Sequence, residues 1–384
     1  MSTSDTSRLR SARWFGPRDL TGVVHRTAIK SEGISQHSLD GRPVVGICNS
    51  WSELVNCNLH FRGLAAAVKR GVLQAGGLPL EFPTMSLGES LMKPSAMLYR
   101  NLMAMDVEES IRSYPLDAIV LLGGCDKTVP SQLMGAASAD VPAIMVTGGP
   151  MMPAVFRGRE LGVGTDTWHY AQELRAGRMT EEEFAELEAA AKPGYGHCNE
   201  MGTASTMTSI VEALGMCLPG TSSIPAADSN HVRMCSAVGR RIVEMVWEDL
   251  TPTKIMTKAA FKNAIVVAMA MGCSTNAVIH LVAMARRAGH DIRLEDFDEA
   301  SRRVPVIANI RPSGSEYLME DFYYAGGLIG LMSRLKGLLD LTPQPPAAIE
   351  AFSNCHCAPC LAAGWSGNPA RCRRGHPRGG WAGP

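Results

Sequence analysis

The segment 123–128, Gly-Gly-Cys-Asp-Lys-Thr, places a thiol, a carboxylate and an amine side by side. It follows the apolar run 118–122, which is typical of a strand buried in a parallel sheet. Residues 129–139 favour a helix, and Thr128 or Ser131 could cap its start. Ligands of open α/β sheets bind at the carboxyl ends of strands, where glycines allow a close backbone approach. Two interpretations stay open for this segment alone: a metal-binding loop, or a strand-end turn with an incidental cysteine.

The elements that must position this segment form an alternating pattern. We expect strands over residues 43–48, 80–83, 118–122, 142–147 and 304–310. We expect helices over residues 59–75, 95–113, 129–139, 165–176, 180–191, 203–216, 230–248, 257–271, 277–288, 294–303 and 328–339. This alternation predicts an α/β fold with a mostly parallel sheet, helices on both of its faces and a helix-rich insertion.

The cysteines of the chain are a second group of residues that could do chemistry. The sequence has eleven of them, and Cys57, Cys125 and Cys198 each lie in a polar or glycine-bearing loop before a predicted helix. None of the three belongs to a CxxC pair, but loops at neighbouring strand ends of a sheet can bring distant residues together. Three thiolates suit an iron–sulfur cluster that keeps one iron open, and an open iron is what a Lewis-acid catalyst needs. In contrast, Cys48, Cys217 and Cys235 have apolar or helical neighbours and are expected in the core.

The overall composition bears on the class of partner and on the compartment. Hydrophobic residues make up 46% of the chain, and 37 basic residues balance 37 acidic ones. A formal charge of zero gives no reason to expect nucleic acid or an acidic membrane surface as partner. No run of about 18 apolar residues occurs, so no membrane span is expected. Residues 1–13 lack the apolar region of a secretory signal, so we expect a cytoplasmic protein with reduced thiols.

The character of the sequence changes near residue 342. From there to residue 384 it is rich in Pro, Gly, Arg and Cys without helical or strand periodicity, which predicts disorder. The run 355–360, Cys-His-Cys-Ala-Pro-Cys, could form a metal knuckle, but no second ligand cluster stands at a zinc-finger spacing. We therefore divide the chain into an N-terminal extension with a first helix (1–35), an α/β domain (36–341) and an aberrant tail (342–384).

Several motifs together resemble the dihydroxy-acid and sugar-acid dehydratase family. They appear in order between residues 10 and 340, at 46–51, 56–58, 123–127, 197–199, 201–204, 218–220, 274–277 and 312–314. The stretch 85–90, with 10–13 upstream of Trp14, is closer to the arabinonate and xylonate branch than to the branched-chain amino-acid branch. Cys273 stands where the family usually has glycine.

This resemblance implies an activity and a set of ligands. The family dehydrates a 2,3-dihydroxy acid to a 2-keto-3-deoxy acid. Cys57, Cys125 and Cys198 match the ligands of its iron–sulfur cluster, a 2Fe–2S cluster in aldonate enzymes. The magnesium site is matched by Glu89, Asp126 and Lys127, and the family's lysine is carbamylated and catalytic. Full-length members are expected to be homo-oligomers that act on small sugar acids.

The implied chemistry accounts for these residue types. Hydroxide is a poor leaving group, so the C3 hydroxyl needs a Lewis acid, and Mg²⁺ on the substrate carboxylate would offset the charge that develops at C2. Mg²⁺ prefers oxygen ligands, which Glu89 and Asp126 supply. A lysine amine would repel the ion, whereas a carbamate turns the same side chain into an anionic oxygen ligand.

Each of these residues also has a plainer interpretation. Asp126 could cap the following helix, Lys127 could be a solvated lysine, and Glu89 could be a loop carboxylate. His197 could merely shape its loop. Residues 274–276 are expected to cap a helix, with a substrate contact as the sharper alternative.

The family's C-terminal domain, a β-rich barrel-like unit, supplies a serine base and a further carboxylate, and the sequence leaves the family pattern near Leu341. We therefore expect this chain to be truncated and to turn over weakly or not at all by itself. The competing interpretations are a branched-chain dihydroxy-acid dehydratase, a non-catalytic fragment, or a nucleotide-binding module. The last is disfavoured because no GxGxxG or GxxxxGK[ST] follows a strand.

Overall fold

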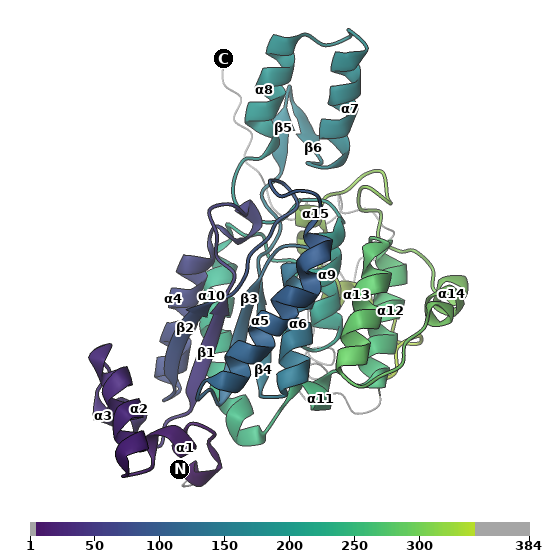
Figure 1. Ribbon diagram of the computed structural model, residues 1–384. Helices are drawn as coiled ribbons and strands as arrows, with labels where there is room; N and C mark the ends of the chain where they lie inside the picture. Colours follow the sequence, from purple (N-terminus) through teal and green to yellow (C-terminus); the bar gives the residue numbers. More distant parts are fainter. Residues whose placement is uncertain (1–4, 342–384) are drawn as a thin grey trace.

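The computed structural model describes residues 5–341 of the chain. Its centre is a four-stranded, fully parallel sheet in the order β2-β1-β3-β4 (Figure 1). The strands are β1 (Val44–Asn49), β2 (Leu78–Pro83), β3 (Ala118–Gly123) and β4 (Ala143–Thr147). Every residue of β1, β3 and β4 is buried, because helices cover both faces of the sheet, whereas β2 forms an edge and is partly exposed. The predicted α/β class and the four predicted strands of this sheet are confirmed.

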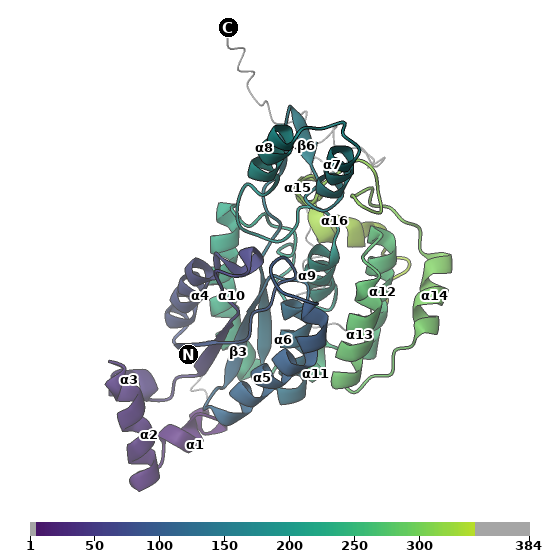
Figure 2. The same cartoon turned by 45° about the horizontal axis from the view of Figure 1, so that its top comes forward.

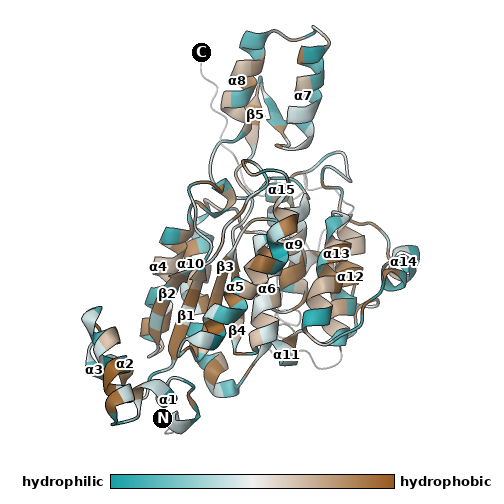
Figure 3. Cartoon of the chain, viewed as in Figure 1, coloured by the Kyte–Doolittle hydropathy of each residue, from teal (hydrophilic) through white to brown (hydrophobic). Residues whose placement is uncertain are grey.

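Two helix layers enclose the sheet. On one face α4 (Phe61–Gln74) packs against α10 (Ser229–Glu248), and on the other α5 (Arg100–Ser113) packs against α6 (Thr128–Ala139) (Figure 1). A further group extends beyond α6: α9 (Thr203–Ala213), α12 (Lys258–Met271), α13 (Asn276–Arg287) and α14 (Leu294–Arg303). Figure 3 shows that hydrophobic residues concentrate in the strands and on the inward sides of these helices. None of the helices in the part of the chain described here has the length and hydropathy that crossing a bilayer requires.

A small unit stands away from the sheet, at the top of Figures 1 and 2. It consists of the hairpin β5 (Ala154–Phe156) and β6 (Arg159–Leu161) followed by α7 (Thr165–Arg175) and α8 (Glu181–Ala191). Ala154, Phe156, Leu161 and Leu187 form a separate hydrophobic cluster in it. The two helices are the predicted insertion, and Thr180 begins α8 with the expected capping box. The hairpin was not predicted.

The remaining elements are short apart from α2. Near the N-terminus these are η1 (Thr6–Arg8), α1 (Ala12–Phe15), α2 (Leu20–Ser31) and α3 (Gln36–Leu39). Further along the chain come η2 (Asn56–Asn58), η3 (Ala96–Tyr99), α11 (Pro252–Ile255), α15 (Met319–Tyr324) and α16 (Gly327–Arg334). The N-terminal segment is fixed to the domain by Ser11, which hydrogen bonds with the buried Asp117 through its backbone N–H and its hydroxyl. Because Asp117 also accepts the N–H of Val44, one carboxylate joins this segment to the start of β1.

Two of the predicted elements were wrong in part. The strand predicted at 304–310 is a loop that makes a single isolated bridge, between Ile310 and Tyr317. Its N–H groups at Ile307 and Ala308 instead bond to the carbonyl of Ala270 near the end of α12, so they are not available to a sheet. The last helix, α16, ends at Arg334 and not at residue 339. The predicted tail and its Cys355–Cys360 run lie outside the described residues.

Candidate active site

The site begins at the point where the connections of the sheet reverse direction. β1 and β3 are neighbours, but the chain leaves β1 through α4 toward β2 and leaves β3 through α6 toward β4, on opposite faces. The loops after two such strands diverge, and the crevice between them is where open α/β sheets bind ligands. Cys57 lies in the loop after β1, and Cys125 lies directly after β3.

Glycines allow these loops to touch through their backbones. A Cβ atom on Gly124 would lie 2.9 Å from the carbonyl oxygen of Cys57 and 2.9 Å from the ring of Phe61. A Cβ atom on Gly148, which follows β4, would lie 2.8 Å from the Cα of Gly124. Side chains at either position would force the loops apart. The close backbone approach expected at the glycines after β3 is therefore present, and its partner is the Cys57 loop.

The loop that carries Cys198 is tied to the same place. The Gly196 N–H donates to the carbonyl of Asn56 (3.2 Å), and the Asn56 side-chain amide donates to the carbonyl of Gly196 (3.3 Å). His197 pairs with the segment after β4, since its N–H donates to Gly149 and its carbonyl accepts from Met151. The loops of all three predicted cysteine ligands thus meet at the carboxyl end of the sheet.

The thiols themselves influence one another. The pKa of Cys125 is raised, first by hydrogen bonding with the side chain of Cys57 and then by burial. Cys198 is an exposed residue, but the protein around its sulfur partly desolvates the thiol. This desolvation raises the pKa of Cys198 to about 11, and the nearby Cys57 adds to the rise. Cys57 therefore lies near both of the others. Among residues 5–341, however, no three Cys, His, Asp or Glu side chains are already arranged as a metal site, so cluster ligation remains a prediction.

The three predicted magnesium residues are in direct contact. Lys127 is almost fully buried, and its Nζ lies 2.7 Å from Oδ2 of Asp126 and 3.1 Å from Oε1 of Glu89. Glu89 is held in place by hydrogen bonds from the Ser95 hydroxyl and the Ala96 N–H. Burial disfavours the charged amine, but Asp126 and Glu89 outweigh this, so the pKa of Lys127 is raised. Two carboxylates from separate loops thus converge on one ammonium group, and carboxylate oxygens are ligands that Mg²⁺ accepts.

The hydrogen bonds at the start of α6 exclude the interpretation of Asp126 as a helix cap. The helix begins at Thr128, and Lys127 occupies the N-cap position without a capping side chain, so neither Thr128 nor Ser131 caps the helix as predicted. The Thr128 hydroxyl bonds to the backbone of Cys125. Asp126 accepts from the Cys125 thiol (3.3 Å) and from Lys127. Its carboxylate therefore joins the thiol to the amine and does not cap the helix.

Two buried histidines, His197 and His231, and the partly buried His60 surround the cysteine loops, a feature that the sequence analysis missed apart from His197. His60 bonds to the carbonyl of Gly148 (2.8 Å) and stacks on Tyr195, and His231 bonds to the carbonyl of Thr147 (2.7 Å). Burial is the largest cause that lowers the pKa of His60, His197 and His231, to about 3 for His60 and about 4 for His197. These imidazoles are neutral and support the loops. The regular spacing that identifies helices and strands offers no signal for such a cluster.

Comparison with known proteins agrees with this geometry. A family described as the N-terminal domain of dihydroxy-acid/6-phosphogluconate dehydratases matches residues 42–344. The chain belongs to this family. An L-arabinonate dehydratase of Rhizobium leguminosarum bv. trifolii is 53% identical over 328 residues, which cover 85% of this chain and 56% of that protein. An L-arabonate dehydratase of Azospirillum brasilense is 53% identical over 340 residues, with 88% and 58% covered. A dihydroxy-acid dehydratase of Pyrococcus abyssi is 41% identical over 319 residues, with 82% and 57% covered.

Members of the family with these names are dehydratases, that is, hydro-lyases. The chain spans somewhat more than half the length of these relatives.

The other described cysteines differ from the three at the site. Cys48, Cys217 and Cys235 are buried among core residues, as expected, and burial is the largest cause that raises their pKa.

Proposed function

We propose that the chain provides the cofactor-binding part of a hydro-lyase that converts a 2,3-dihydroxy sugar acid to a 2-keto-3-deoxy acid. The observation that supports this most strongly is the convergence of Glu89 and Asp126 on Lys127, directly beside the meeting point of three cysteine loops. Soft sulfur donors and hard oxygen donors thus occur next to each other, as a site with an iron–sulfur cluster and a magnesium ion requires.

The residues divide the work by their chemistry. Cys57, Cys125 and Cys198 would hold the cluster, while Glu89, Asp126 and a carbamylated Lys127 would hold Mg²⁺. When bound, these groups would supply Lewis acidity toward the C3 hydroxyl and the carboxylate of the acid. The nearly buried position of Lys127 would keep water from its side chain, and the hydrogen bonds from Ser95 and Ala96 would orient Glu89.

An aldonate is the substrate we favour. The relatives named as L-arabinonate and L-arabonate dehydratases are 53% identical to the chain, compared with 41% for the relative named as a dihydroxy-acid dehydratase. The alternatives are a branched-chain dihydroxy acid as substrate and a fragment without activity. Seven free cysteines among the described residues suit a reducing compartment such as the cytoplasm. We also expect a homo-oligomer, as the resemblance to the full-length family implies.

Anaerobic reconstitution of the chain with iron and sulfide tests the cofactor assignment. We expect visible charge-transfer absorption, which Cys57→Ser, Cys125→Ser and Cys198→Ser should each reduce strongly. Cys235→Ala is the matched control, because this buried thiol lies on α10 in the hydrophobic core. A colourless reconstituted protein, or a Cys57→Ser variant with unchanged absorption, would refute the assignment.

Substrate and activity need a separate assay. We expect dehydration of L-arabinonate in preference to 2,3-dihydroxyisovalerate when the chain is extended with the C-terminal part of a relative, and little turnover by the chain alone. Rates of the chain alone that match those of a full-length relative would contradict the second expectation. A preference for the branched-chain acid would favour the alternative substrate.

A further inference from the structure

The motif at residues 274–276 connects two helices near the site. The Ser274 hydroxyl lies 2.9 Å from the hydroxyl of Thr203, and the Asn276 side-chain amide donates to the same Thr203 oxygen (3.0 Å). Ser274 also accepts the N–H of Asn276, the first residue of α13, whereas the N-cap residue Thr275 makes no capping bond with its side chain. Thr203 begins α9, directly after the Cys198 loop, so the motif fixes the start of α13 beside the site. From there α13 packs along α6, the helix that follows Lys127.

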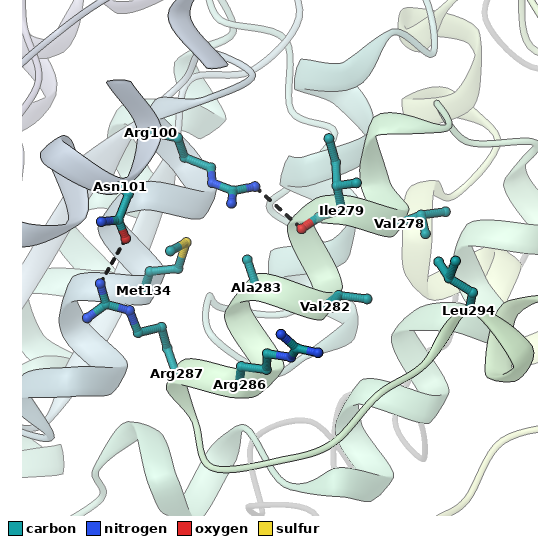
Figure 4. A pocket seen from close by; sticks show the side chains of 10 residues that line it. All are labelled: Arg100, Asn101, Met134, Val278, Ile279, Val282, Ala283, Arg286, Arg287 and Leu294. Carbon is teal, nitrogen blue, oxygen red and sulfur yellow. Dashed lines mark hydrogen bonds between the residues drawn. The ribbon is translucent and has the colours of Figure 1, made fainter. Parts of the chain in front are cut away.

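One turn into α13, His280 is fully buried and has a defined tautomer. Its Nδ1 lies 3.0 Å from Nη1 of Arg100, a residue that lines a surface groove between α5 and α13 and also donates to the carbonyl of Ile279 (Figure 4). A guanidinium group can only donate, so Nδ1 must accept and the proton of the neutral imidazole must be on Nε2. Burial, followed by the charges of Arg100 and Lys127, lowers the pKa of His280 to about 3, which agrees with a neutral ring.

The proton on Nε2 has no acceptor. His280 Nε2 is buried and makes no hydrogen bond within the described chain, and the same holds for Nε of Arg100. Buried donors are nearly always paired in folded proteins, so two unpaired donors on adjacent side chains need an explanation. Because α13 starts beside Thr203 and packs along α6, which begins directly after Lys127, His280 in the first turns of α13 lies toward the Lys127 end of the site. The missing acceptor is therefore expected at the Lys127 end of the site, where the unpaired donors of His280 and Arg100 favour an anionic oxygen.

We propose that His280, held as the Nε2–H tautomer by Arg100, is a positioning residue that donates a hydrogen bond to a carboxylate-type oxygen beside Lys127. Such an oxygen has two sources with the same chemistry: a carbamate formed on Lys127 by carbon dioxide, or the carboxylate of the bound acid. The inference rests on the proposed function and extends it to a residue outside the predicted ligand set.

Three variants of the full chain test this proposal. His280→Leu removes the donor, and His280→Gln restores an N–H near the position of Nε2. His290→Leu is the matched control, since it removes a partly buried histidine that bonds to the carbonyl of Met256 away from the site. Two signals are measured for each protein: the ¹³C NMR carbamate resonance with ¹³C-bicarbonate and Mg²⁺, and the affinity for L-arabinonate by calorimetry.

The two signals distinguish the sources of the oxygen. If the carbamate is the acceptor, His280→Leu lowers carbamate occupancy at limiting bicarbonate by roughly tenfold, since a charge-assisted hydrogen bond is lost. If the acid is the acceptor, carbamate formation is unchanged and the affinity for L-arabinonate falls by a similar factor. In either case His280→Gln recovers most of the loss and His290→Leu shows none.

The proposal would be overturned if His280→Leu and the unaltered chain showed the same carbamate occupancy and the same affinity for L-arabinonate. It would also be overturned if the unaltered chain showed neither a carbamate resonance nor binding of L-arabinonate. The iron–sulfur absorption spectrum is read on the same samples. A normal spectrum together with unaffected anion binding would refute the role of His280 alone, whereas a missing spectrum would refute the proposed function.

Discussion

The proposed function requires the Lys127 side chain to exist in two chemical states. As an ammonium group it neutralises Glu89 and Asp126, and its raised pKa means that the pair of carboxylates stabilises that charge. Reaction with carbon dioxide requires the neutral amine, so carbamylation must compete with this ion pair. A divalent cation between the carboxylates would take over the role of the ammonium charge, and we therefore expect Mg²⁺ and bicarbonate to bind cooperatively.

The lowered pKa values of two histidines predict how the stability of the protein depends on pH. His60 and His231 bond to the carbonyls of Gly148 and Thr147, and the pKa of each is lowered, mainly by burial. Because the folded-state pKa lies below the unfolded value of about 6.5, their stabilising effect is fully present above that pH and is lost as the pH falls toward the folded pKa. Each histidine can contribute up to about 1.4 kcal/mol per pH unit to the slope.

Urea unfolding between pH 7.5 and pH 5 measures this slope. We expect the free energy of unfolding to fall steadily below about pH 6.5, and His60→Gln to make the slope shallower by up to one proton. His37→Gln, at an exposed position, is the control and should leave the slope nearly unchanged. A flat profile, or identical slopes for His60→Gln and the unaltered chain, would show that these histidines do not control acid stability.

The strands and helices differed in how well the sequence predicted them. Continuous apolar runs such as 118–122 identified the buried strands correctly, because in a covered parallel sheet both faces of a strand need apolar side chains. The apolar residues at 304–310 gave a similar signal, but in the structure the N–H groups of Ile307 and Ala308 bond to the carbonyl of Ala270 near the end of α12. The three-residue strands β5 and β6 are too short for periodicity to reveal. Local patterns thus predict elements whose environment is uniform and fail where a single tertiary contact decides.

The candidate site was predictable only in part, for a related reason. Its members come from separate loops spread along the chain from Cys57 to Cys198, and no spacing rule connects Cys57, Glu89 and Cys198. The resemblance to known dehydratases supplied the grouping. His280 was overlooked because the motif before it was interpreted only as a helix cap. The sequence places His280 four residues after Asn276, which is about one turn further along the same predicted helix.

The crossing of α4 and α10 gives a prediction at the level of packing. A Cβ atom on Gly71 would collide with the backbone carbonyl of Ser236, and one on Gly239 would lie 2.9 Å from the Cα of Gly71 and would collide with the carbonyl of Val68. Because backbone atoms cannot move aside, we expect Gly71→Ala or Gly239→Ala to destabilise the protein by about 3 kcal/mol or more.

Gly63 offers a matched control on the same helix. A Cβ atom there meets nothing within 4 Å, so Gly63→Ala should stabilise the protein by about 0.5–1 kcal/mol through the higher helix propensity of alanine. Urea unfolding of the three variants measures the difference. If all three changes had similar effects, the close contact between α4 and α10 would not be what holds this face of the sheet together.

In the molecule as a whole, the unit of β5, β6, α7 and α8 stands apart from the sheet (Figure 2) and has its own core, and it is attached through the residues that follow Cys198. Asn199 bonds to the backbone of Leu161 and Val163. The nearly buried Glu200 accepts the N–H groups of Gly164 and Thr165 at the start of α7. Two residues next to a predicted cluster ligand therefore orient the whole unit, and motion of the unit would be transmitted to that ligand.

Replacing this carboxylate should release the unit without unfolding either part. In Glu200→Gln the N–H groups of Gly164 and Thr165 lose a charged acceptor, so we expect their hydrogen exchange to accelerate by roughly tenfold, while exchange in β3 stays slow. Glu186→Gln, which alters an exposed ion pair on α8, should leave both regions unchanged. Hydrogen exchange with mass spectrometry, read on peptides covering 160–168 and 116–124, makes the comparison. Faster exchange in both peptides of Glu200→Gln would instead mean that the unit and the sheet open together, and that Glu200 supports the fold of the entire domain and not the attachment of one part.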